Sequence, residues 1–157
     1  MSDELIPIGI KGVVPASGTC MIFLGNDDKT FVIFIDHLIG QALTIYMSEQ
    51  HRQRPLTHDL ITAMMKAFGA ELKRVIINDA KDKTFFARII LSMDNELGKK
   101  IIELDARPSD SIALALHLKR PLLVAKHVYE GSEDMTEILE RMLKQQSEEA
   151  TGEEEPT

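Results

Sequence analysis

The sequence predicts a single α+β domain, in which a mixed or mostly antiparallel sheet of about six or seven strands is packed by three to four helices. Two observations lead to this fold class. Strand-like segments form two main groups, one near the start of the chain and one after residue 70, instead of alternating regularly with helices. Segments with apolar residues at helical spacing separate and follow these groups. The chain has 157 residues, 44% of them hydrophobic, which is enough for one core.

The expected strands are apolar or alternating runs bounded by turn signals. They span residues 6–14, 19–24, 31–35, 72–78, 85–93, 100–104 and 121–125. The run at 31–35 is apolar throughout, which predicts a strand covered on both faces. Short turns separate the three strands between residues 72 and 104, so we expect an antiparallel meander there.

Helices are expected where apolar residues take up the helical period. The first runs from residue 38 to about residue 49, and the second begins at Thr57 and ends before Gly69, a typical C′ residue. The apolar stripe of this second helix consists of Leu60, Ile61, Met64, Ala67 and Phe68. A third helix follows Pro108 and is apolar nearly all round, which predicts burial against the sheet and against a further surface such as a dimer partner.

The domain is expected to occupy residues 1–146 and to end with an amphipathic helix after residue 133. Residues 147–157 are acidic and polar, and we expect them to be disordered. They hold five of the 25 acidic residues and no base. With 18 lysines and arginines the chain has a net charge of −7, and removing those five negative charges leaves −2. The chain has no dense basic stripe, so its charge does not support general nucleic-acid binding, although it permits a local contact.

Composition and motifs also indicate where the protein is located and which cofactors it can use. No apolar run is long enough to span a bilayer, and the first residues lack the basic and apolar regions of a signal peptide. We therefore expect a cytoplasmic protein with no membrane partner. The single cysteine, Cys20, excludes an internal disulfide, and its apolar neighbours predict a buried, unreactive thiol. P-loop and Rossmann motifs are missing from the sequence, so no organic cofactor is expected.

The most informative segment is residues 104–116, where a strand end is followed by a charged corner and an apolar helix. Pro108 suits the first position of a helix, and Ser109 or Asp110 can satisfy donors of its first turn. Arg107 and the neighbouring carboxylates converge on a helix N-terminus, which favours an anion such as a phosphate. The same residues also describe a well-capped, buried helix.

A second Arg-Pro pair, Arg54-Pro55, precedes another helix, for which Thr57 is the N-cap candidate. His58 and Asp59 follow in the first turn. His58 is the best single catalytic candidate, because a neutral imidazole can act as a general base near pH 7. The alternative is a solvent-facing or capping histidine.

Asp105 and Asp110 can together bind a divalent cation, Mg²⁺ or Mn²⁺, that stabilises the charge developing on a phosphodiester. Asp59 is a further candidate ligand. In the alternative interpretation, Asp110 caps its helix while Asp105 pairs with Arg107 or with a neighbouring arginine. A guanidinium offers two parallel donors to a phosphate, but it also forms structural ion pairs with aspartates. The candidate phosphate-binding residues are Arg54, Arg107 and Ser109.

Three motifs occur in order along the chain. They are Arg-Pro-x-Thr-His-x-Leu at 54–60, Gly-Ala-x-x-x-x-Val-x-Ile at 69–77, and Asp-Ala-Arg-Pro-Ser-Asp-Ser-Ile-Ala-Leu-Ala-Leu at 105–116. In these motifs the sequence resembles the bifunctional nuclease family, over residues 8–128. The resemblance implies an α+β domain that forms a dimer and that degrades DNA and RNA.

One position departs from the family pattern, because Gln41 stands where relatives often have a glutamate. A mechanism that depends on that carboxylate is therefore in doubt here. Two functions stay open at this point. The first is a nuclease that hydrolyses phosphodiester bonds in DNA or RNA with a divalent metal. The second is a non-catalytic dimeric interaction module that binds an anionic ligand or a protein partner.

Overall fold

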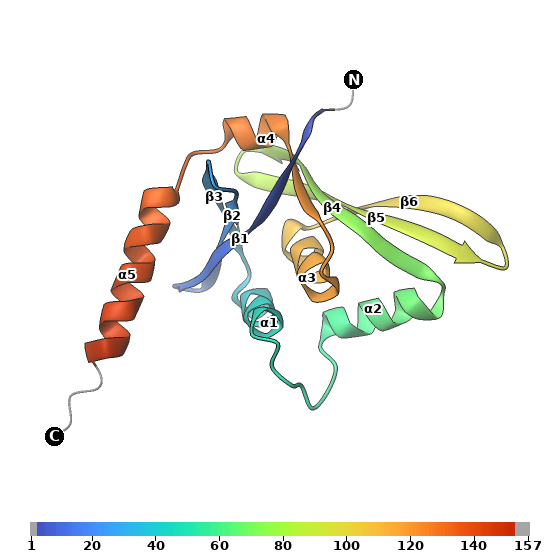
Figure 1. Cartoon of the computed structure of the whole chain (residues 1–157), viewed down its shortest axis with the longest axis horizontal. Coiled ribbons are helices and arrows are strands. Elements are labelled where there is room, and N and C mark those ends of the chain that lie inside the picture. The colour runs from blue at the N-terminus through green and yellow to red at the C-terminus, as the bar shows by residue number, and fades with distance from the viewer. Residues whose placement is uncertain (1–2, 153–157) are drawn as a thin grey trace.

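The computed structural model describes residues 3–152 and has the expected α+β fold, with one seven-stranded sheet and five helices in that range (Figure 1). The strands are β1 (Leu5–Ala16), β2 (Thr19–Gly25), β3 (Thr30–Ile35), β4 (Ala70–Lys81), β5 (Thr84–Asn95), β6 (Gly98–Ala106) and β7 (Leu122–Ala125). The helices are α1 (His37–Met47), α2 (Thr57–Ala67), α3 (Pro108–Leu118), α4 (Lys126–Gly131) and α5 (Thr136–Gly152).

The sheet has the strand order β3-β2-β1-β7-β4-β5-β6. Neighbouring strands are antiparallel except β4 and β7, which run parallel, so the sheet is mixed. The short strand β7 joins the group β1–β3 to the meander β4–β6. Figure 1 shows these two groups as limbs that diverge from the centre of the sheet, with α3 between them.

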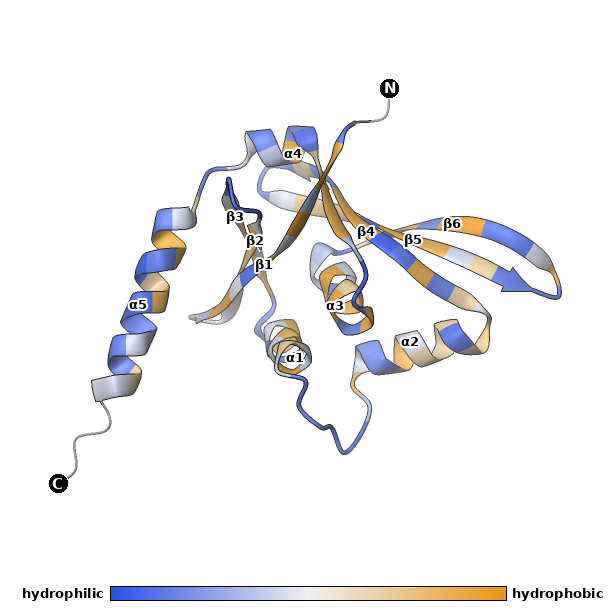
Figure 2. Ribbon diagram, in the orientation of Figure 1, coloured by the Kyte–Doolittle hydropathy of each residue, from blue (hydrophilic) through white to orange (hydrophobic). Residues whose placement is uncertain are grey.

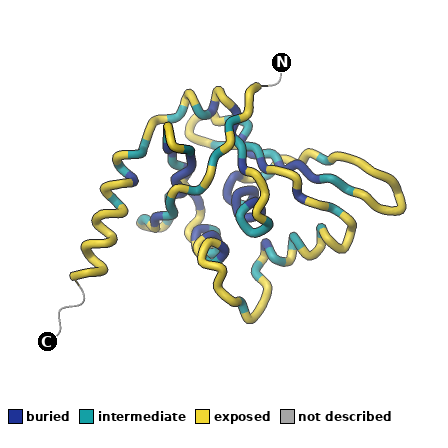
Figure 3. The backbone as a smooth tube through the Cα atoms, viewed as in Figure 1, coloured by how far each residue is buried: buried dark blue, intermediate teal, exposed yellow. Residues whose placement is uncertain are grey.

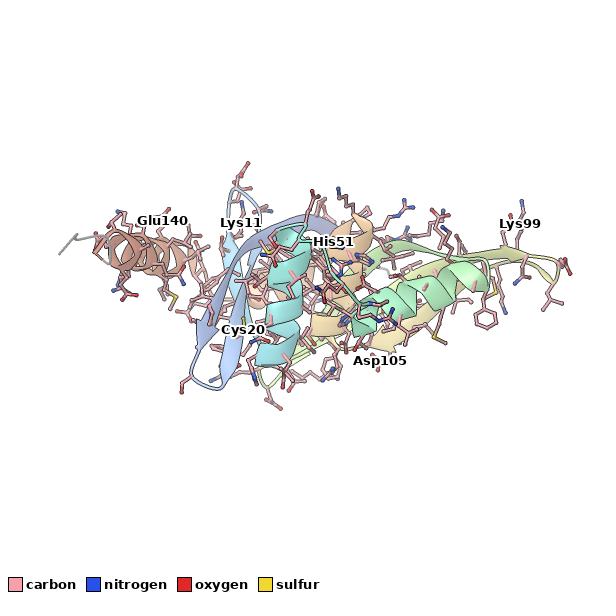
Figure 4. The ribbon with its side chains drawn as sticks, turned by 90° about the horizontal axis from the view of Figure 1, so that it is seen from below. Lys11, Cys20, His51, Lys99, Asp105 and Glu140 are labelled. Carbon is pink, nitrogen blue, oxygen red and sulfur yellow. The ribbon has the colours of Figure 1, made fainter. Side chains whose placement is uncertain are left out.

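The main core lies on one face of the sheet, under α1 and α3. It includes Ile22, Val75 and Ile112, which come from both limbs and from α3. Helix α1 packs closely on β2 because Gly40 places no side chain at the contact, where a Cβ atom would lie 2.6 Å from the Sγ atom of Cys20. Cys20 is buried beside α1, as predicted (Figure 4), and burial raises the pKa of its thiol.

Helix α5 packs on the opposite face of the β1–β3 limb, where Leu139 contacts a second, smaller cluster with Val14 and Phe23. The helix continues to Gly152, so residues 147–152, which we expected to be disordered, are helical and exposed. The rest of the expected tail, residues 153–157, lies outside the described residues. Within residues 3–152, no helix combines the length and the apolar character needed to cross a membrane.

The antiparallel meander is confirmed, but its strands are longer than expected. The first turn lies at Asp82 and Lys83, both with positive φ angles, and not at residues 79–82. Gly69 ends α2 with a φ of 73°, as predicted for a C′ glycine. Helix α2 thus precedes the first strand of the meander, and α3 directly follows its last strand. The meander therefore determines where the two helix starts with their Arg-Pro pairs lie.

Candidate functional site

Helix α3 begins directly after β6, with Arg107 as N-cap and Pro108 at the first helical position, as predicted. Asp110 lies in the first turn but does not cap the helix. Its Oδ1 atom lies 3.0 Å from Nε2 of His58, and its Oδ2 atom accepts a 2.9 Å hydrogen bond from Nε of Arg107. The alternative interpretation is therefore wrong in two points: Asp110 does not cap α3, and Arg107 pairs with Asp110 instead of Asp105.

Helix α2 begins at Thr57 with Leu56 as N-cap, one residue before the expected cap. Asp59 satisfies this helix start, because its Oδ2 atom accepts a 2.7 Å hydrogen bond from the N–H of Leu56. Thr57 itself is exposed. His58 is only 4% exposed, so the interpretation of His58 as a solvent-facing residue is wrong.

Asp59 also binds three side chains from outside α2. Arg52 donates two hydrogen bonds to its carboxylate, at 2.9 and 2.7 Å. The hydroxyl of Tyr46 donates to Oδ1 at 3.3 Å, and Nε2 of His117 lies 3.2 Å from the same atom. The Tyr46 ring lies 4.7 Å from the His117 ring and 4.9 Å from the guanidinium of Arg52. We call these four residues the Asp59 cluster, and His58, Arg107 and Asp110 the Asp110 cluster.

The electrostatics of the Asp59 cluster follow from burial and from the Arg52 charge. Burial opposes ionisation of Asp59, but the hydrogen bonds from Arg52 and from the Leu56 N–H outweigh it and hold the pKa of Asp59 below its ordinary value. Burial, followed by the Asp59 charge, raises the pKa of Tyr46 to about 12. Burial also lowers the pKa of His117, against the attraction of Asp59. The cluster is therefore an aspartate–arginine pair with a neutral tyrosine and a neutral histidine at pH 7.

The two clusters join α2 to α3 at two points. His58 of α2 contacts Asp110 of α3, and Asp59 of α2 contacts His117 of α3. Asp110 and His117 are seven residues apart, so they lie on the same face of α3. His117 is not among the residues predicted from sequence. Its signal is this seven-residue spacing to Asp110, which becomes meaningful only once α2 is known to lie beside α3.

Asp105 lies on the other face of the sheet from α3. It pairs in register with Arg88, which stands between Ala87 and Ile89, two buried residues. Because neighbouring residues of a strand point to opposite faces, Arg88 and Asp105 point away from the core. Asp105 and Asp110 are thus not placed to hold one metal ion together. Among residues 3–152, no three His, Cys, Asp or Glu side chains are grouped in a way that could hold a metal ion.

The candidate phosphate-binding residues differ in accessibility. Arg54 lies in the exposed, hydrophilic loop between α1 and α2 (Figures 2 and 3) and helps to line a surface hollow of about 610 Å³. Arg107 is 69% exposed, and the hydrogen bond to Asp110 raises the pKa of its guanidinium. Ser109 is buried, with 6% of its surface exposed. Gln41, the departure from the family pattern, lies exposed on α1.

Comparisons with known proteins agree with this fold and these motifs. A family model of the bifunctional nuclease domain matches residues 22–136. An uncharacterized protein of Mycobacterium tuberculosis (strain H37Rv) is 32% identical over 126 residues, which are 80% of this chain and 73% of that protein. The corresponding uncharacterized protein of strain CDC 1551 matches to the same extent. The chain belongs to the bifunctional nuclease domain family, which suggests a nuclease-like function.

Proposed function

We propose that this protein hydrolyses phosphodiester bonds in DNA or RNA at the surface where α2 and α3 begin. The observation that carries the proposal is the 3.0 Å contact between His58 Nε2 and Asp110 Oδ1. This contact links the first turns of α2 and α3, the two helices that carry or follow the Arg-Pro pairs at 54–55 and 107–108. Two helix N-termini with arginines beside them suit an anionic substrate.

Arg107 and Arg54 position the phosphate in this proposal. Both are exposed. Arg107 uses Nε to bind Asp110, and a guanidinium carries further N–H groups that can donate to phosphate oxygens. The positive charge of Arg107 also stabilises the negative charge that develops on the phosphorus centre as water attacks. Binding stays local, which fits a chain with a net charge of −7.

Asp110 is the proposed general base. Its side chain is 31% exposed, whereas the side chain of His58 is 6% exposed, so Asp110 is the member of the pair that water can reach. The carboxylate takes a proton from the attacking water while the new P–O bond forms and the bond to the leaving oxygen breaks. His58 acts as a positioning residue that fixes the carboxylate from behind. General-base groups of this kind contribute about 10²–10⁴-fold to a rate.

A role for Mg²⁺ or Mn²⁺ has to be measured, because the predicted ligands Asp105 and Asp110 do not converge and the geometry assigns no step to a metal. The test is the degradation of labelled single-stranded DNA, duplex DNA and RNA, each with Mg²⁺, with Mn²⁺ and with EDTA. Wild type is compared with Asp110→Asn and Arg107→Ala. The matched control is Arg141→Ala, since Arg141 is similarly exposed and is paired with a carboxylate on its own helix, α5.

Activity that falls at least about 100-fold in Asp110→Asn and in Arg107→Ala, but not in Arg141→Ala, would support the proposal. Equal degradation by all four preparations would point to a contaminating nuclease and would reject it. All variants are first checked for folding by circular dichroism.

A non-catalytic dimeric interaction module is the second candidate function. The observation that favours it is the exposure of Leu60, Met64 and Phe68 on α2, next to the charged site. In this case the site binds an anion or a partner without hydrolysis. Pyrophosphate binding that is lost in Arg107→Ala, together with no degradation of any nucleic acid, would favour this function over the first.

A further inference from the structure

Strand β3 forms one edge of the sheet and carries no charged residue. The sequence predicts that β3 is covered on both faces, but its Phe34 is 63% exposed. Proteins usually keep an open edge from pairing with other chains by placing charged side chains on it. The other edge strand, β6, has four of them: Lys99, Lys100, Glu103 and Asp105. Strand β3 is therefore an edge that lacks the usual protection.

The backbone of β3 presents hydrogen-bonding groups along this edge. Both backbone groups of Thr30 point away from β2, because its C=O accepts a 2.6 Å bond from Met135 N–H and its N–H donates to Asp134 Oδ1 at 3.3 Å. Alternate residues of an antiparallel strand share this direction, so the N–H and C=O of Val32 and Phe34 also point outward. Within the described part of the chain, these four groups have no hydrogen-bond partner. The protein thus pairs the first position of the edge and leaves the next two open.

A groove of about 540 Å³ lies beside this edge, and its volume is typical of a binding site. Strand β3 contributes Phe31, Val32 and Phe34 to its lining. Phe31 belongs to the main core, whereas Val32 packs on the cluster under α5, so the two side chains lie on opposite faces of the sheet. A groove that touches both must run along the edge of the strand.

The far wall of the groove comes from the turned end of the β4–β5 hairpin and from α4, which Figure 1 shows close to β3. The rings of Phe31 and Phe85 stack at 6.2 Å and join this wall to β3. The groove is therefore bounded on both sides by the same chain.

We propose that β3 binds an extended peptide segment of another protein, which adds to the sheet as an eighth strand in this groove. Outward N–H and C=O groups at the spacing of a strand are satisfied by the backbone of a further strand. A second copy of this chain fits the groove less well, because its own β3 is attached to the rest of its sheet. The β4–β5 turn and α4 leave room beside β3 for one strand only.

The lining also indicates the chemistry of the peptide. The side chains of an added strand alternate between two faces. One set lies on the side of Phe34 and the other on the side of Phe31, and both sides are apolar. The charged lining residues are few: Lys83, His127 and Glu133. Of these, His127 is already paired with two carboxylates, those of Asp3 and Asp79. The expected peptide is therefore apolar over several consecutive residues and carries few charges.

The first probe is a phage-displayed library of random linear nine-residue peptides, selected on the immobilised full chain. Selected peptides are synthesised with a fluorescent label, and their binding is measured by fluorescence anisotropy. We expect them to be apolar in consecutive positions and to bind Phe34→Lys at least about 10-fold more weakly than wild type, because the lysine places a charge on the edge. The matched control is Ile101→Lys, an apolar residue of the other edge strand that is 69% exposed, and it should bind like wild type.

A second variant fills the groove from the opposite wall. Gly131 of α4 lines the groove, and a Cβ atom added there meets no atom within 4 Å. Gly131→Leu should therefore keep the fold, which circular dichroism checks for every variant, and should weaken peptide binding as Phe34→Lys does.

Methyl groups on the amides of a selected peptide test the backbone pairing directly. Methylation of the alternate amides that face β3 should raise the dissociation constant at least about 10-fold, whereas methylation of the intervening amides should leave it nearly unchanged. A library that yields no apolar peptide, equal binding by wild type, Phe34→Lys and Gly131→Leu, or equal effects of the two methylation patterns would each overturn the proposal. A molar mass that falls in Phe34→Lys would also overturn it, by showing a second copy of this chain on the edge.

This inference goes beyond the proposed hydrolysis and does not depend on it. No residue that lines the groove belongs to the Asp59 cluster or to the Asp110 cluster. Because the readout is peptide binding, its failure is separate from a failure of the nuclease assay.

Discussion

Asp59 and Asp110 occupy the same position in two similar helix starts, yet their carboxylates bind different kinds of partner. Each is the third residue of its helix, but Arg54-Pro55 precedes α2, whereas Pro108 of the second Arg-Pro pair is itself the first residue of α3. Asp59 folds back to the N-cap N–H of its own helix and binds Arg52 with both oxygens. Asp110 accepts no hydrogen bond from a backbone N–H of its own helix; it binds the side chain of Arg107 and contacts His58 of the other helix. The position in the helix therefore does not decide the role of the carboxylate; its neighbours do.

The two carboxylates also differ in their access to solvent. The side chain of Asp59 is 13% exposed and that of Asp110 is 31% exposed. Asp59 has a backbone N–H, an arginine, a tyrosine and a histidine around it, which leaves little room for a substrate. Asp110 has one buried partner and one exposed partner, so a substrate can compete for the exposed one. This contrast makes Asp59 a structural residue and Asp110 the better candidate for chemistry, although the sequence ranks them alike.

The largest effect is expected from removing the structural carboxylate. Asp59→Ala should lower the free energy of unfolding by about 3 kcal/mol, because it leaves Arg52 and the start of α2 without their partner. Asp110→Ala should lower it by less, about 1–2 kcal/mol, since Arg107 is exposed and can be solvated and only the buried His58 is left without its partner. Urea denaturation of both variants measures the difference. Equal losses would mean that the two clusters do not divide into a structural one and a functional one.

The stability of the protein should depend on pH through His117, the histidine of the Asp59 cluster. Burial lowers the pKa of His117 in the folded state. The stability that the neutral, buried His117 contributes is therefore fully present above the unfolded-state pKa of about 6.5. It is lost as the pH falls through the lower, folded-state pKa. His117→Gln should flatten the decline in stability below about pH 6.5. His127 has the opposite sign, because Asp3 and Asp79 raise its pKa and its contribution is lost as the pH rises. Urea midpoints of wild type and His117→Gln between pH 5 and 8 isolate the first effect, and parallel curves would contradict it.

The hydroxyl of Tyr46 should matter less than the carboxylate that it binds. Tyr46→Phe keeps the ring beside His117 and Arg52 and removes one hydrogen bond of 3.3 Å to Asp59. We expect a loss of about 0.5–1 kcal/mol in unfolding free energy. The loss should vanish when Asp59 is already alanine, which a double-mutant cycle measures. An undiminished loss in that background would show that Tyr46 acts through packing and not through the cluster.

Much of the fold could be predicted from the sequence, because hydrophobic period and turn residues are local signals. The meander, the Gly69 stop and the helix start at Pro108 are of this kind. The site was harder, because it depends on which helices lie side by side. No local pattern reveals that His58 is buried against Asp110 or that His117 reaches Asp59. The face of the sheet on which Asp105 lies could not be predicted either, because proximity in sequence does not show that Asp105 and the following helix lie on opposite faces.

The smallest change in stability is expected from Arg107→Ala. Compared with Arg52→Ala, it gives the sharpest test of the difference between the two clusters. Arg52 and Arg107 each bind one of the aspartates, but Arg52 is largely covered and held by two hydrogen bonds, whereas Arg107 is 69% exposed and held by one. Arg52→Ala should cost about 1.5–3 kcal/mol of unfolding free energy and Arg107→Ala less than about 0.5 kcal/mol. If Arg107 serves the substrate, its loss should nevertheless abolish phosphate binding, measured by pyrophosphate titration calorimetry. An Arg107→Ala protein that is clearly less stable but binds normally would reverse the assignment and make both clusters structural.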